Sequence, residues 1–591
     1  MCGIFGYVGN KDNVATLTLE GLKLLEYRGY DSWGIAVKAQ KKFIVEKHTG
    51  KIENVNENSE IFKASSSLGI GHTRWATHGG VTVQNAHPHL DCTRSVAVVH
   101  NGIVENFQEL KDDLIKKGHK FLSQTDTEVI PHLIEDYLQK EGFASSVRDT
   151  FNRLKGLNAI VVSYAKSSEI IAVKNGSPLV VGLGEGEFFV ASDIISIIKY
   201  TRKIIFVKDW EMVIMGKKDI QLLHLPEGNK LKIVPEEVTW KFEESNKGKF
   251  DHFLIKEIYE QPNVIRNIAQ NYQDQVKELS SIIKKAKGTF FIGAGTAFHA
   301  GLAGVYLFSK TAHKHINTAV ASEFNYLEDF LTHESLIIAL SQSGETIDVI
   351  EPLNRAKNKG CKIVAITNTL GSSIYRMADF KVLLNAGPEK AVASTKAYTA
   401  KLCVILMLVF AGIGRLSDVK KILLDGADEI ERLFENKNIN QIKNIASILS
   451  KIKNIYVIGR GVSYSSALEA ALKIKEVSYV PTEGLAGGEL KHGTIALIEK
   501  GTPCIVFAPQ DETYESIISN AIEIKSRGGV IIGISHKNSE AFDHFIEVKD
   551  VKDGSYIAQV VVAQLLAYYM AVNLKLDPDK PRNLAKSVTV K

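Results

Sequence analysis

The stretch FFIGAGTAFHAGLAGVYLFSK, residues 290–310, decides the fold of the second half of the chain. It begins with a short apolar run, turns at Gly-Ala-Gly and continues with apolar residues at helical spacing. The stretch IYVIGRGVSYSSALEAALKIK, residues 455–475, repeats this order of strand, G-x-G turn and helix. Continuous apolar strands that alternate with helices are typical of a parallel sheet buried on both faces. We therefore expect an α/β fold in this half.

A second pair of segments repeats at almost the same offset. Residues 336–367, LIIALSQSGETIDVIEPLNRAKNKGCKIVAIT, match residues 504–535, CIVFAPQDETYESIISNAIEIKSRGGVIIGIS. Two independent matches at nearly one offset indicate an internal duplication. They predict two similar doubly wound lobes, with cores at about 280–415 and 450–575.

Residues 1–237 have a different pattern, in which short strand-like segments end at Gly or Asp. These segments are IFGYVG, SSLGIGHTRW, SVAVVHNG, AIVVSYA, EIIAVKN, LVVGLG and EFFVASD. Two segments have helical spacing, TLTLEGLKLLEYRG and TEVIPHLIEDYLQK. This mixture predicts an α+β domain with sheets and helices in separate layers.

The composition changes between the two halves, where the charged and apolar-poor segment EESNKGK is typical of a linker. We therefore predict a division of the chain into successive segments. These are a first domain at 2–237, a linker at 238–250, a first α/β lobe at 251–430, a second lobe at 431–575 and a C-terminal tail at 576–591.

The 591-residue chain has the composition of a globular protein, with 45% hydrophobic and 24% charged residues. Its net charge of +5 includes no large basic cluster, so we expect no nucleic-acid partner. The five cysteines are scattered, which argues against a disulfide framework, and polar residues interrupt the first twenty positions, which argues against a signal peptide. These features predict a cytoplasmic protein.

The longest uncharged stretch is SYIAQVVVAQLLAYYMAVNL, residues 555–574. By length alone it could cross a membrane. Its two glutamines, Gln559 and Gln564, favour instead a helix that is buried at a subunit or lobe interface. We therefore expect no association with a membrane.

The loop that follows LIIAL differs from its counterpart in the second copy. The first copy, SQSGET, has hydroxyls at Ser341, Ser343 and Thr346, whereas the second copy, PQDET, has a carboxylate at Asp511. Hydroxyls and backbone N–H groups between a strand end and a helix start form a site for anions, which a carboxylate would repel. We therefore predict a phosphate site in the first lobe. The alternative is that the hydroxyls only cap a helix.

Neither a cofactor nor a metal is predicted. The G-x-G turns lack the acidic residue at a following strand end that would bind the ribose of NAD or FAD. His72, His78, His87 and His89 lie close together in sequence but match no ligand pattern such as H-E-x-x-H.

The chain begins MCGIFGYVGN, with a cysteine directly after the initiator methionine. Removal of Met1 would leave Cys2 with a free α-amine, which titrates near pH 8. This amine can act as general base to the thiol of the same residue, and the thiolate is the competent nucleophile. The position therefore predicts a nucleophile that needs no His or Asp partner. A cysteine placed there by chance is the alternative.

Long motifs cover nearly the whole chain in a fixed order. CGIFGYVG, LEYRGYDSWG, GHTRWATHG, NAHPH, HNGIVENF and TDTEVI resemble the glutaminase domain of the N-terminal-nucleophile amidotransferases. SQSGETIDV, VASTKAYT, LKIKEVSYV, GGELKHGTIALI and PRNLAKSVTV resemble the sugar-isomerase (SIS) half found in one branch of that family. The resemblance implies a layered α/β/β/α glutaminase domain followed by two doubly wound SIS lobes.

The resemblance also implies an activity, the transfer of ammonia from L-glutamine to D-fructose 6-phosphate with ketose-to-aldose isomerisation. The products would be D-glucosamine 6-phosphate and L-glutamate, in the first step of hexosamine synthesis. It implies no cofactor, an internal route for ammonia, and a homodimer in which a neighbouring subunit supplies His492. Two alternatives stay open, a non-enzymatic sugar-phosphate sensor and a glutaminase that feeds a different acceptor.

In the first domain, the resemblance implies that Cys2 attacks the side-chain amide of glutamine. The side chain of Asn101 and the backbone N–H of Gly102 would hold the oxyanion. The other implied residues are Arg74 for the α-carboxylate, Asp126 for the α-ammonium, Arg28, Thr77 and His78 around the pocket, and Trp75 as a gate between the two active sites.

In the second half, the resemblance implies that Glu476 transfers the proton, His492 opens the ring and Lys586 forms a Schiff base. The other implied sugar-phosphate residues are Ser341, Gln342, Ser343, Thr346, Val392, Glu469, Lys473 and Ala585.

Two observations qualify these sugar-site roles. Without the resemblance, Lys473 and Glu476 would be read as an ion pair on a solvated helix face. Ala297 lacks a hydroxyl that the family has near the sugar.

Overall fold

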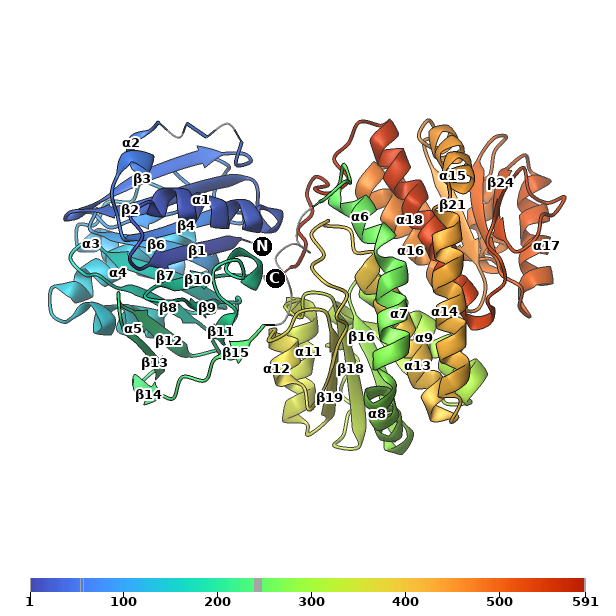
Figure 1. The fold of residues 1–591 in the computed structure, drawn as a ribbon, viewed down its shortest axis with the longest axis horizontal. Helices are drawn as coiled ribbons and strands as arrows, with labels where there is room; N and C mark the ends of the chain where they lie inside the picture. The colour runs from blue at the N-terminus through green and yellow to red at the C-terminus, as the bar shows by residue number, and fades with distance from the viewer. Residues whose placement is uncertain (1, 54, 57, 239–246, 589–591) are drawn as a thin grey trace. The chain divides into compact units, whose positions relative to one another are not determined.

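A computed structural model describes residues 2–53, 55–56, 58–238 and 247–588. The chain forms two compact units, Met1–Asn246 with Ala585–Lys591, and Lys247–Leu584 (Figure 1). Most of the predicted linker, 238–250, lies outside the described residues, and so does Met1. The finer division of the chain at 237, 430 and 575 stays a prediction.

Two antiparallel sheets form the centre of the first unit. The first sheet has the order β15 (Glu236–Glu237), β11 (Lys203–Phe206), β9 (Val180–Leu183), β10 (Phe188–Ala191), β1 (Gly3–Val8), β4 (Leu68–Arg74), β2 (Ser32–Ala39) and β3 (Lys42–Thr49). The second has the order β14 (Asn229–Leu231), β13 (Ile220–His224), β12 (Glu211–Met215), β8 (Ile170–Lys174), β7 (Asn158–Tyr164), β6 (Val96–Gly102) and β5 (His89–Leu90).

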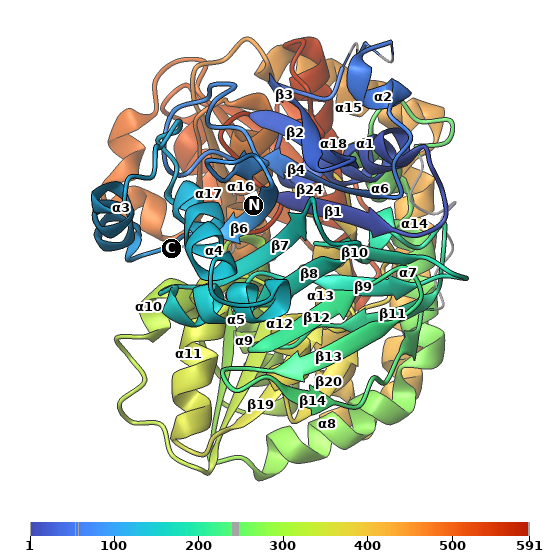
Figure 2. The same cartoon turned by 90° about the vertical axis from the view of Figure 1, so that its left-hand side faces the viewer.

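Alternating side chains place these sheets between two helical layers. On β6, Ala97 and Val99 face the first sheet, while Val96 and Val98 pack against helices, because successive side chains of a strand point to opposite faces. The helices are α1 (Val14–Leu25) on the first sheet, and α3 (Phe107–Lys116), α4 (Val129–Leu138) and α5 (Phe143–Arg153) on the second (Figures 1 and 2). The short helix α2 (Glu60–Lys63) follows β3. The layered α/β/β/α arrangement is confirmed.

The second unit contains two parallel sheets with the same strand order. The first is β17 (Asn317–Val320), β16 (Gly288–Gly293), β18 (Ser335–Ser341), β19 (Lys362–Thr367) and β20 (Phe380–Leu383). The second is β22 (Thr482–Ala486), β21 (Ile455–Gly459), β23 (Pro503–Ala508), β24 (Val530–Ser535) and β25 (His544–Glu547). The common order confirms the predicted duplication. The edge strands β17, β20, β22 and β25 were not predicted.

Helices cover both faces of each sheet. In the first lobe they are α6 (Phe253–Tyr259), α7 (Gln261–Asn271), α8 (Gln273–Lys285), α9 (Thr296–Ala312), α10 (Ala321–Phe324), α11 (Ile347–Asn358), α12 (Ser373–Met377) and α13 (Lys396–Gly412). They continue with α14 (Leu416–Leu433), α15 (Asn436–Leu449), α16 (Val462–Ser478), α17 (Tyr514–Lys525) and α18 (Ser555–Asn573). One apolar core runs through both lobes and includes α13 and α18.

Helix α18 contains the stretch that is long enough to span a membrane. Among the described residues, 552–573 form the one helix that passes this test, and 89% of the tested window is buried inside the protein. The amide of Gln564 accepts a hydrogen bond from Gln261 Nε2 at 2.8 Å within this core. The predicted burial of this helix between the lobes is confirmed.

Candidate functional site

A small pocket in the first unit lies beside Cys2, where β1 begins. Its lining includes most of the residues that the resemblance assigned to glutamine. The lining residues are Cys2, Arg74, Trp75, Thr77, His78, His87, His100, Gly102, Thr125, Asp126 and Thr127. Arg28 and Asn101 contact the backbone of Cys2 directly, so the structure brings all nine predicted residues of this site together.

The environment of the Cys2 thiol is formed by backbone groups. The N–H of Trp75 donates to Sγ at 3.2 Å, and Sγ lies 3.6 Å from the carbonyl oxygen of Trp75. Burial raises the pKa of the Cys2 thiol, and the Trp75 N–H and the cations of Arg74 and Arg28 oppose this increase. Among the described residues, no side chain is hydrogen-bonded to Sγ as a base. This agrees with a base supplied by the α-amine, although the predicted loss of Met1 concerns a residue outside the described part.

Asn101 is held in one orientation beside Cys2. Its Nδ2 donates to the carbonyl oxygen of Cys2 at 3.2 Å and to Ser192 Oγ at 2.8 Å. Its Oδ1 lies 3.1 Å from His72 Nε2, which is also 3.0 Å from the carbonyl oxygen of His100. Since both oxygens only accept, His72 carries its proton on Nε2. The imidazole therefore fixes which end of the Asn101 amide faces Cys2.

Four histidines form a buried, uncharged layer at the pocket, and two of them, His87 and His100, line it. The rings of His72 and His87 stack at 4.1 Å, and His89 lies edge-on to His87. Burial lowers the pKa of His72 to about 3, and it also lowers the pKa values of His87, His89 and His100. His100, which the sequence did not single out, bonds to Thr127 and Asn158. Neutral rings of this kind position neighbouring groups.

Opposite charges line two sides of the pocket. The buried guanidinium of Arg74 donates to the carbonyl oxygens of His78, Gly79 and Gly80, so it also holds that loop. The buried carboxylate of Asp126 accepts from the N–H of Val104 at 2.7 Å. An α-amino acid has a carboxylate and an ammonium group, which such a pair of side chains can bind.

The segment EYRGYDS supports the residues around Trp75. The N–H of Asp31 donates to the carbonyl oxygen of Arg74 at 3.0 Å, and the Asp31 carboxylate accepts from the N–H of Ala76 at 2.9 Å. The ring of Tyr30 meets Trp75 edge-on at 5.8 Å. The sequence did not assign roles to Tyr30 or Asp31, because their partners lie far away along the chain.

In the second unit, the strand order of the first parallel sheet reverses between β16 and β18. Ligands of open α/β sheets bind at the carboxyl ends of the strands where the order reverses, and in this order that point lies between these two strands. The loop Ser341–Thr346 begins at the end of β18 and leads into α11. The predicted phosphate loop therefore lies at the expected edge, next to the N-terminus of a helix.

The hydroxyls of this loop are arranged by a glycine turn. Ser341 Oγ accepts from the N–H of Gly344 at 3.0 Å and lies 3.4 Å from Thr346 Oγ1. Gly344 has φ +66°, and a Cβ there would lie 2.0 Å from Ser372 Oγ. Only glycine fits this position.

The second copy has an acidic group in the same place. Asp511 Oδ1 accepts from both the N–H and the hydroxyl of Thr513, at 2.8 and 2.6 Å. A carboxylate therefore already occupies this helix start, which leaves the first lobe as the better anion site.

A buried polar network connects the two lobes at α9 and α16. Glu469 is fully buried, and its carboxylate lies 2.8 Å from His299 Nδ1 and 3.1 Å from Thr296 Oγ1. Lys473 Nζ lies 3.6 Å from Glu469 and forms an ion pair with Glu476. Burial lowers the pKa of Lys473, but the carboxylates of Glu476 and Glu469 outweigh it and the pKa is raised.

The alternative interpretation of this segment, an ion pair on a solvated helix face, is confirmed for the ion pair and wrong for the solvated face. Lys473 and Glu476 do pair, but Lys473 is buried, so the helix face is not solvated. His299 and Thr296 were not singled out from the sequence, because only the tertiary fold brings them to Glu469.

Comparisons with known proteins agree with both halves. Residues 72–199 match the glutamine amidotransferase domain family, and residues 282–411 and 448–574 match the SIS domain family. The chain is 41% identical to a protein of Thermococcus kodakarensis and 43% identical to one of Pyrococcus horikoshii, over 100% of each chain. Both are named glutamine–fructose-6-phosphate aminotransferase (isomerizing). The chain belongs to this family.

A solved structure from the aminotransferase family supports the fold of the second unit. The C-terminal domain of glucosamine-fructose-6-phosphate aminotransferase from Francisella tularensis is 30% identical and has a TM-score of 0.53, covering 56% of this chain and 99% of that domain. The predicted fold class, an α+β glutaminase domain followed by two SIS lobes, is confirmed.

The remaining residues that family resemblance assigned to the sugar site lie on different elements and differ in burial. Val392 is buried, and its N–H donates to the carbonyl oxygen of Asp579 at 3.0 Å. His492 is exposed at the end of a short 3-10 helix, Glu489–His492. Ala585 and Lys586 belong to the first unit, so their part in the sugar site stays a prediction. Ala297 is buried near the start of α9.

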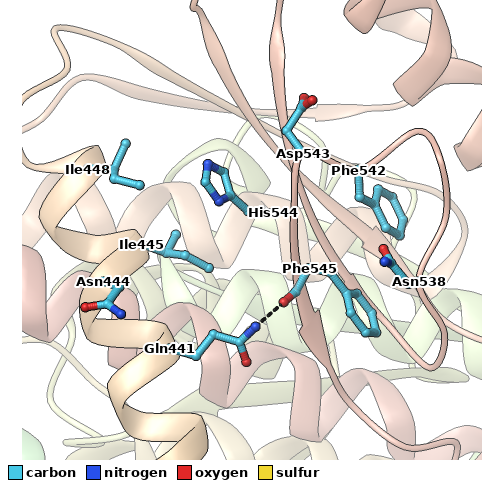
Figure 3. A pocket seen from close by; sticks show the side chains of 9 residues that line it. All are labelled: Gln441, Asn444, Ile445, Ile448, Asn538, Phe542, Asp543, His544 and Phe545. Carbon is cyan, nitrogen blue, oxygen red and sulfur yellow. Dashed lines mark hydrogen bonds between the residues drawn. The ribbon is translucent and has the colours of Figure 1, made fainter.

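Another pocket lies at the far edge of the second parallel sheet, between α15 and β25 (Figure 3). Gln441 Nε2 donates to the carbonyl oxygen of Phe545 at 2.6 Å across it. None of the site residues predicted from the aminotransferase family lines this pocket. It lies away from the strand ends where ligands of such sheets bind.

Proposed function

We propose that this protein transfers ammonia from L-glutamine to D-fructose 6-phosphate and isomerises the product to D-glucosamine 6-phosphate. The proposal rests on one chain, related over its full length to enzymes of this name. This chain has both a Cys2 pocket lined by Arg74 and Asp126 and a hydroxyl-bearing loop between β18 and α11. L-Glutamate is the second product.

In the first unit, the Cys2 thiolate attacks the side-chain amide of glutamine, whose α-groups are bound by Arg74 and Asp126. The amide oxygen becomes an oxyanion, which the N–H of Gly102 and the amide of Asn101 stabilise. Both N–H groups of Asn101 already have partners. We propose that Asn101 gives up the 3.2 Å bond to the Cys2 carbonyl, the longer of the two, when the oxyanion forms. Ammonia then leaves, and water hydrolyses the thioester.

In the second unit, Ser341, Gln342, Ser343 and Thr346 bind the phosphate at the start of α11. Glu476 moves a proton between carbons 1 and 2 of the sugar. Its ion pair with the buried Lys473 supports this role, because the contact holds the Glu476 carboxylate in a defined position on α16. Family resemblance supports ring opening by His492 and a Schiff base on Lys586.

We also propose that the working form is a cytoplasmic homodimer, in which His492 of each subunit serves the sugar site of its partner. The exposure of His492 supports this assignment. Mixing inactive His492→Ala chains with inactive Glu476→Gln chains should restore part of the synthase activity, since mixed dimers contain one intact site. If the mixture stays inactive although mixed dimers form, His492 serves its own chain.

The direct test of the proposed function is product formation from glutamine and fructose 6-phosphate, followed by mass spectrometry. Glucosamine 6-phosphate should form with the wild-type chain, and Glu476→Gln should reduce it at least about a hundredfold, the typical contribution of a general base. Binding of fructose 6-phosphate without product would support the sensor alternative. Glutamate without glucosamine 6-phosphate would support a different acceptor.

A further inference from the structure

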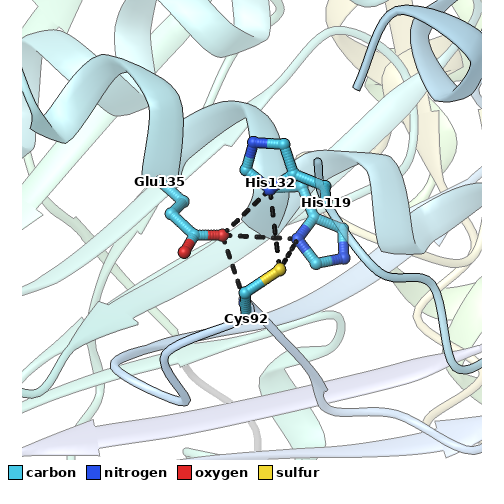
Figure 4. A group of neighbouring side chains, drawn as sticks. All are labelled: Cys92, His119, His132 and Glu135. Carbon is cyan, nitrogen blue, oxygen red and sulfur yellow. Dashed lines mark hydrogen bonds and ion pairs between the residues drawn. The ribbon is translucent and has the colours of Figure 1, made fainter. Parts of the chain in front are cut away.

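Four side chains of metal-ligand type gather on the first unit, and none of them lines the Cys2 pocket. They are Cys92 in the turn after β5, His119 in the loop after α3, and His132 and Glu135 on α4 (Figure 4). Their four ligand atoms lie within 4.8 Å of one another. No sequence motif identifies this group, because its members are spread over more than forty positions.

Four of the six distances between these atoms fit a tetrahedral zinc ion. Zinc bonds of about 2.3 Å to sulfur and about 2.0–2.1 Å to nitrogen or oxygen set the sulfur–nitrogen separation at about 3.6 Å and the nitrogen–oxygen separation at about 3.3 Å. Cys92 Sγ lies 3.7 Å from His119 Nδ1 and 3.6 Å from His132 Nδ1. Glu135 Oε2 lies 3.1 Å from His119 Nδ1 and 3.4 Å from His132 Nδ1.

The local fold holds these ligands in place without the ion. His132 and Glu135 are three residues apart, so they share one face of α4. The turn that carries Cys92 is closed by Asp91, whose carboxylate accepts from the N–H groups of Ser95 and Val96 at 2.7 and 2.6 Å. The N–H of Cys92 itself donates to Glu135 Oε2 at 3.1 Å.

Carboxylates face the outer nitrogens of both histidines. His119 Nε2 lies 2.7 Å from Asp136 Oδ1, and His132 Nε2 lies 3.8 Å from Glu128 Oε1. Metal-bound histidines usually donate their other N–H to such a group, which leaves the first nitrogen as a ligand, and the 2.7 Å contact of His119 has this geometry. An ion-pair cluster alone would explain the contacts of Glu135, but it would not require a thiol at the fourth corner.

We propose that Cys92, His119, His132 and Glu135 bind one structural zinc ion. A thiolate, two neutral imidazoles and a carboxylate balance the charge of the ion once the thiol has released its proton. Four protein ligands leave no open position, so the ion supports the fold and takes no part in catalysis. The ion would connect α4 to the loop that contains His119. The same loop continues to Leu122 and Ser123, whose N–H groups donate to Glu128, and then to Asp126 of the Cys2 pocket.

The test uses the full-length chain and cobalt(II) as a probe. Cobalt added alone to metal-free protein should produce the intense visible bands of a tetrahedral site and a thiolate charge-transfer band, at one ion per chain. Cys92→Ala should abolish the charge-transfer band, whereas Cys2→Ala, the matched control in the same unit, should retain it. A charge-transfer band that persists in Cys92→Ala, or that disappears in Cys2→Ala, would overturn the proposal.

Zinc affinity, measured by competition with a chelator, provides a second readout. Asp136→Asn leaves all four ligands in place but removes the partner of His119, so it should weaken zinc binding about 10–100-fold. Elemental analysis of purified wild-type protein should find one zinc ion per chain. A wild-type chain that binds zinc no more tightly than Cys92→Ala would contradict the assignment even if the variants were poorly folded.

Discussion

Gly102 of the Cys2 pocket cannot be replaced by a larger residue without moving the backbone. It has φ +132°, and a Cβ at this position would lie 2.2 Å from the carbonyl oxygen of Leu157. Any side chain must therefore shift the end of β6, and with it the N–H proposed for the oxyanion. The neighbouring Asn101, which is bonded to His72 and Ser192, would move as well.

We predict that Gly102→Ala lowers the glutaminase rate at least about a hundredfold, the usual cost of losing one oxyanion donor. Isomerisation of fructose 6-phosphate should stay within about twofold of wild type, since the residues proposed for phosphate binding and proton transfer lie in the other unit. Gly142→Ala is the matched control, because a Cβ there meets no atom within 4 Å. A full glutaminase rate in Gly102→Ala would remove Gly102 from the oxyanion site.

The buried histidine layer predicts acid sensitivity of the first unit. In the folded state the pKa values of His72, His87, His89 and His100 lie below their ordinary value, so the unfolded state binds more protons once the pH falls below about 6.5. The stability that these neutral rings provide is complete above that pH. It decreases as the pH falls, by up to about 1.4 kcal/mol per pH unit for each histidine.

Tryptophan fluorescence can measure this effect in the first unit alone. All four tryptophans, Trp33, Trp75, Trp210 and Trp240, lie before residue 247. The free energy of urea unfolding should fall steeply between pH 6.5 and pH 5, and His89→Gln should reduce the slope by about one proton. The control His224→Gln, at an exposed position, should not change it. A free energy that is flat over this range would show that the rings are not neutral.

At the scale of the element, helix α16 depends on the charge of Lys473. Removal of this cation would break the ion pair of the fully buried Glu469, although the carboxylate would keep its contacts with His299 and Thr296. Breaking a buried ion pair on one side typically costs about 3–5 kcal/mol. Lys475 lies on the same helix but is exposed.

We predict that Lys473→Met lowers the thermal stability of the second unit by about 3–5 kcal/mol, whereas Lys475→Met changes it by less than about 0.5 kcal/mol. Thermal unfolding followed by circular dichroism measures both variants. Equal stabilities of the two variants would mean that the network of Glu469 is held by His299 and Thr296 alone.

The loops that precede α11 and α17 allow a second prediction at this scale. Replacing Ser341 by Ala and Thr346 by Val removes hydroxyls proposed to bind phosphate, so KM for fructose 6-phosphate should rise about 10–100-fold, as expected for hydrogen bonds to a charged group. The corresponding change in the second copy, Asp511→Ala with Thr513→Val, should leave KM unchanged. Steady-state kinetics distinguishes them, and a reversed result would place the phosphate in the second lobe.

The central strands could be predicted from the sequence because their apolar runs are continuous and occur twice. The edge strands β17 and β22 could not, since NTAV and TEGLA are short and only partly buried. The site residues also fall into a group that could be predicted from the sequence and a group that could not. Cys2 and the SQSGET loop have local patterns, whereas His100, His299 and the Cys92 cluster depend on contacts between distant segments.

At the scale of the whole molecule, each unit has one proposed reaction, and ammonia links the two. The first unit contains the pocket of Cys2, and the second contains the paired SIS lobes. Neither unit has the groups for the complete reaction in its described residues. The central claim is therefore that the amide nitrogen of glutamine becomes the amino nitrogen of the sugar.

The most direct test supplies glutamine with an isotopically labelled amide nitrogen, together with fructose 6-phosphate, and follows the label by mass spectrometry. The wild-type chain should produce labelled glucosamine 6-phosphate and unlabelled glutamate. Cys2→Ala should form no labelled amino sugar and still isomerise the sugar phosphate. Labelled product from Cys2→Ala, or none from the wild-type chain, would contradict the account.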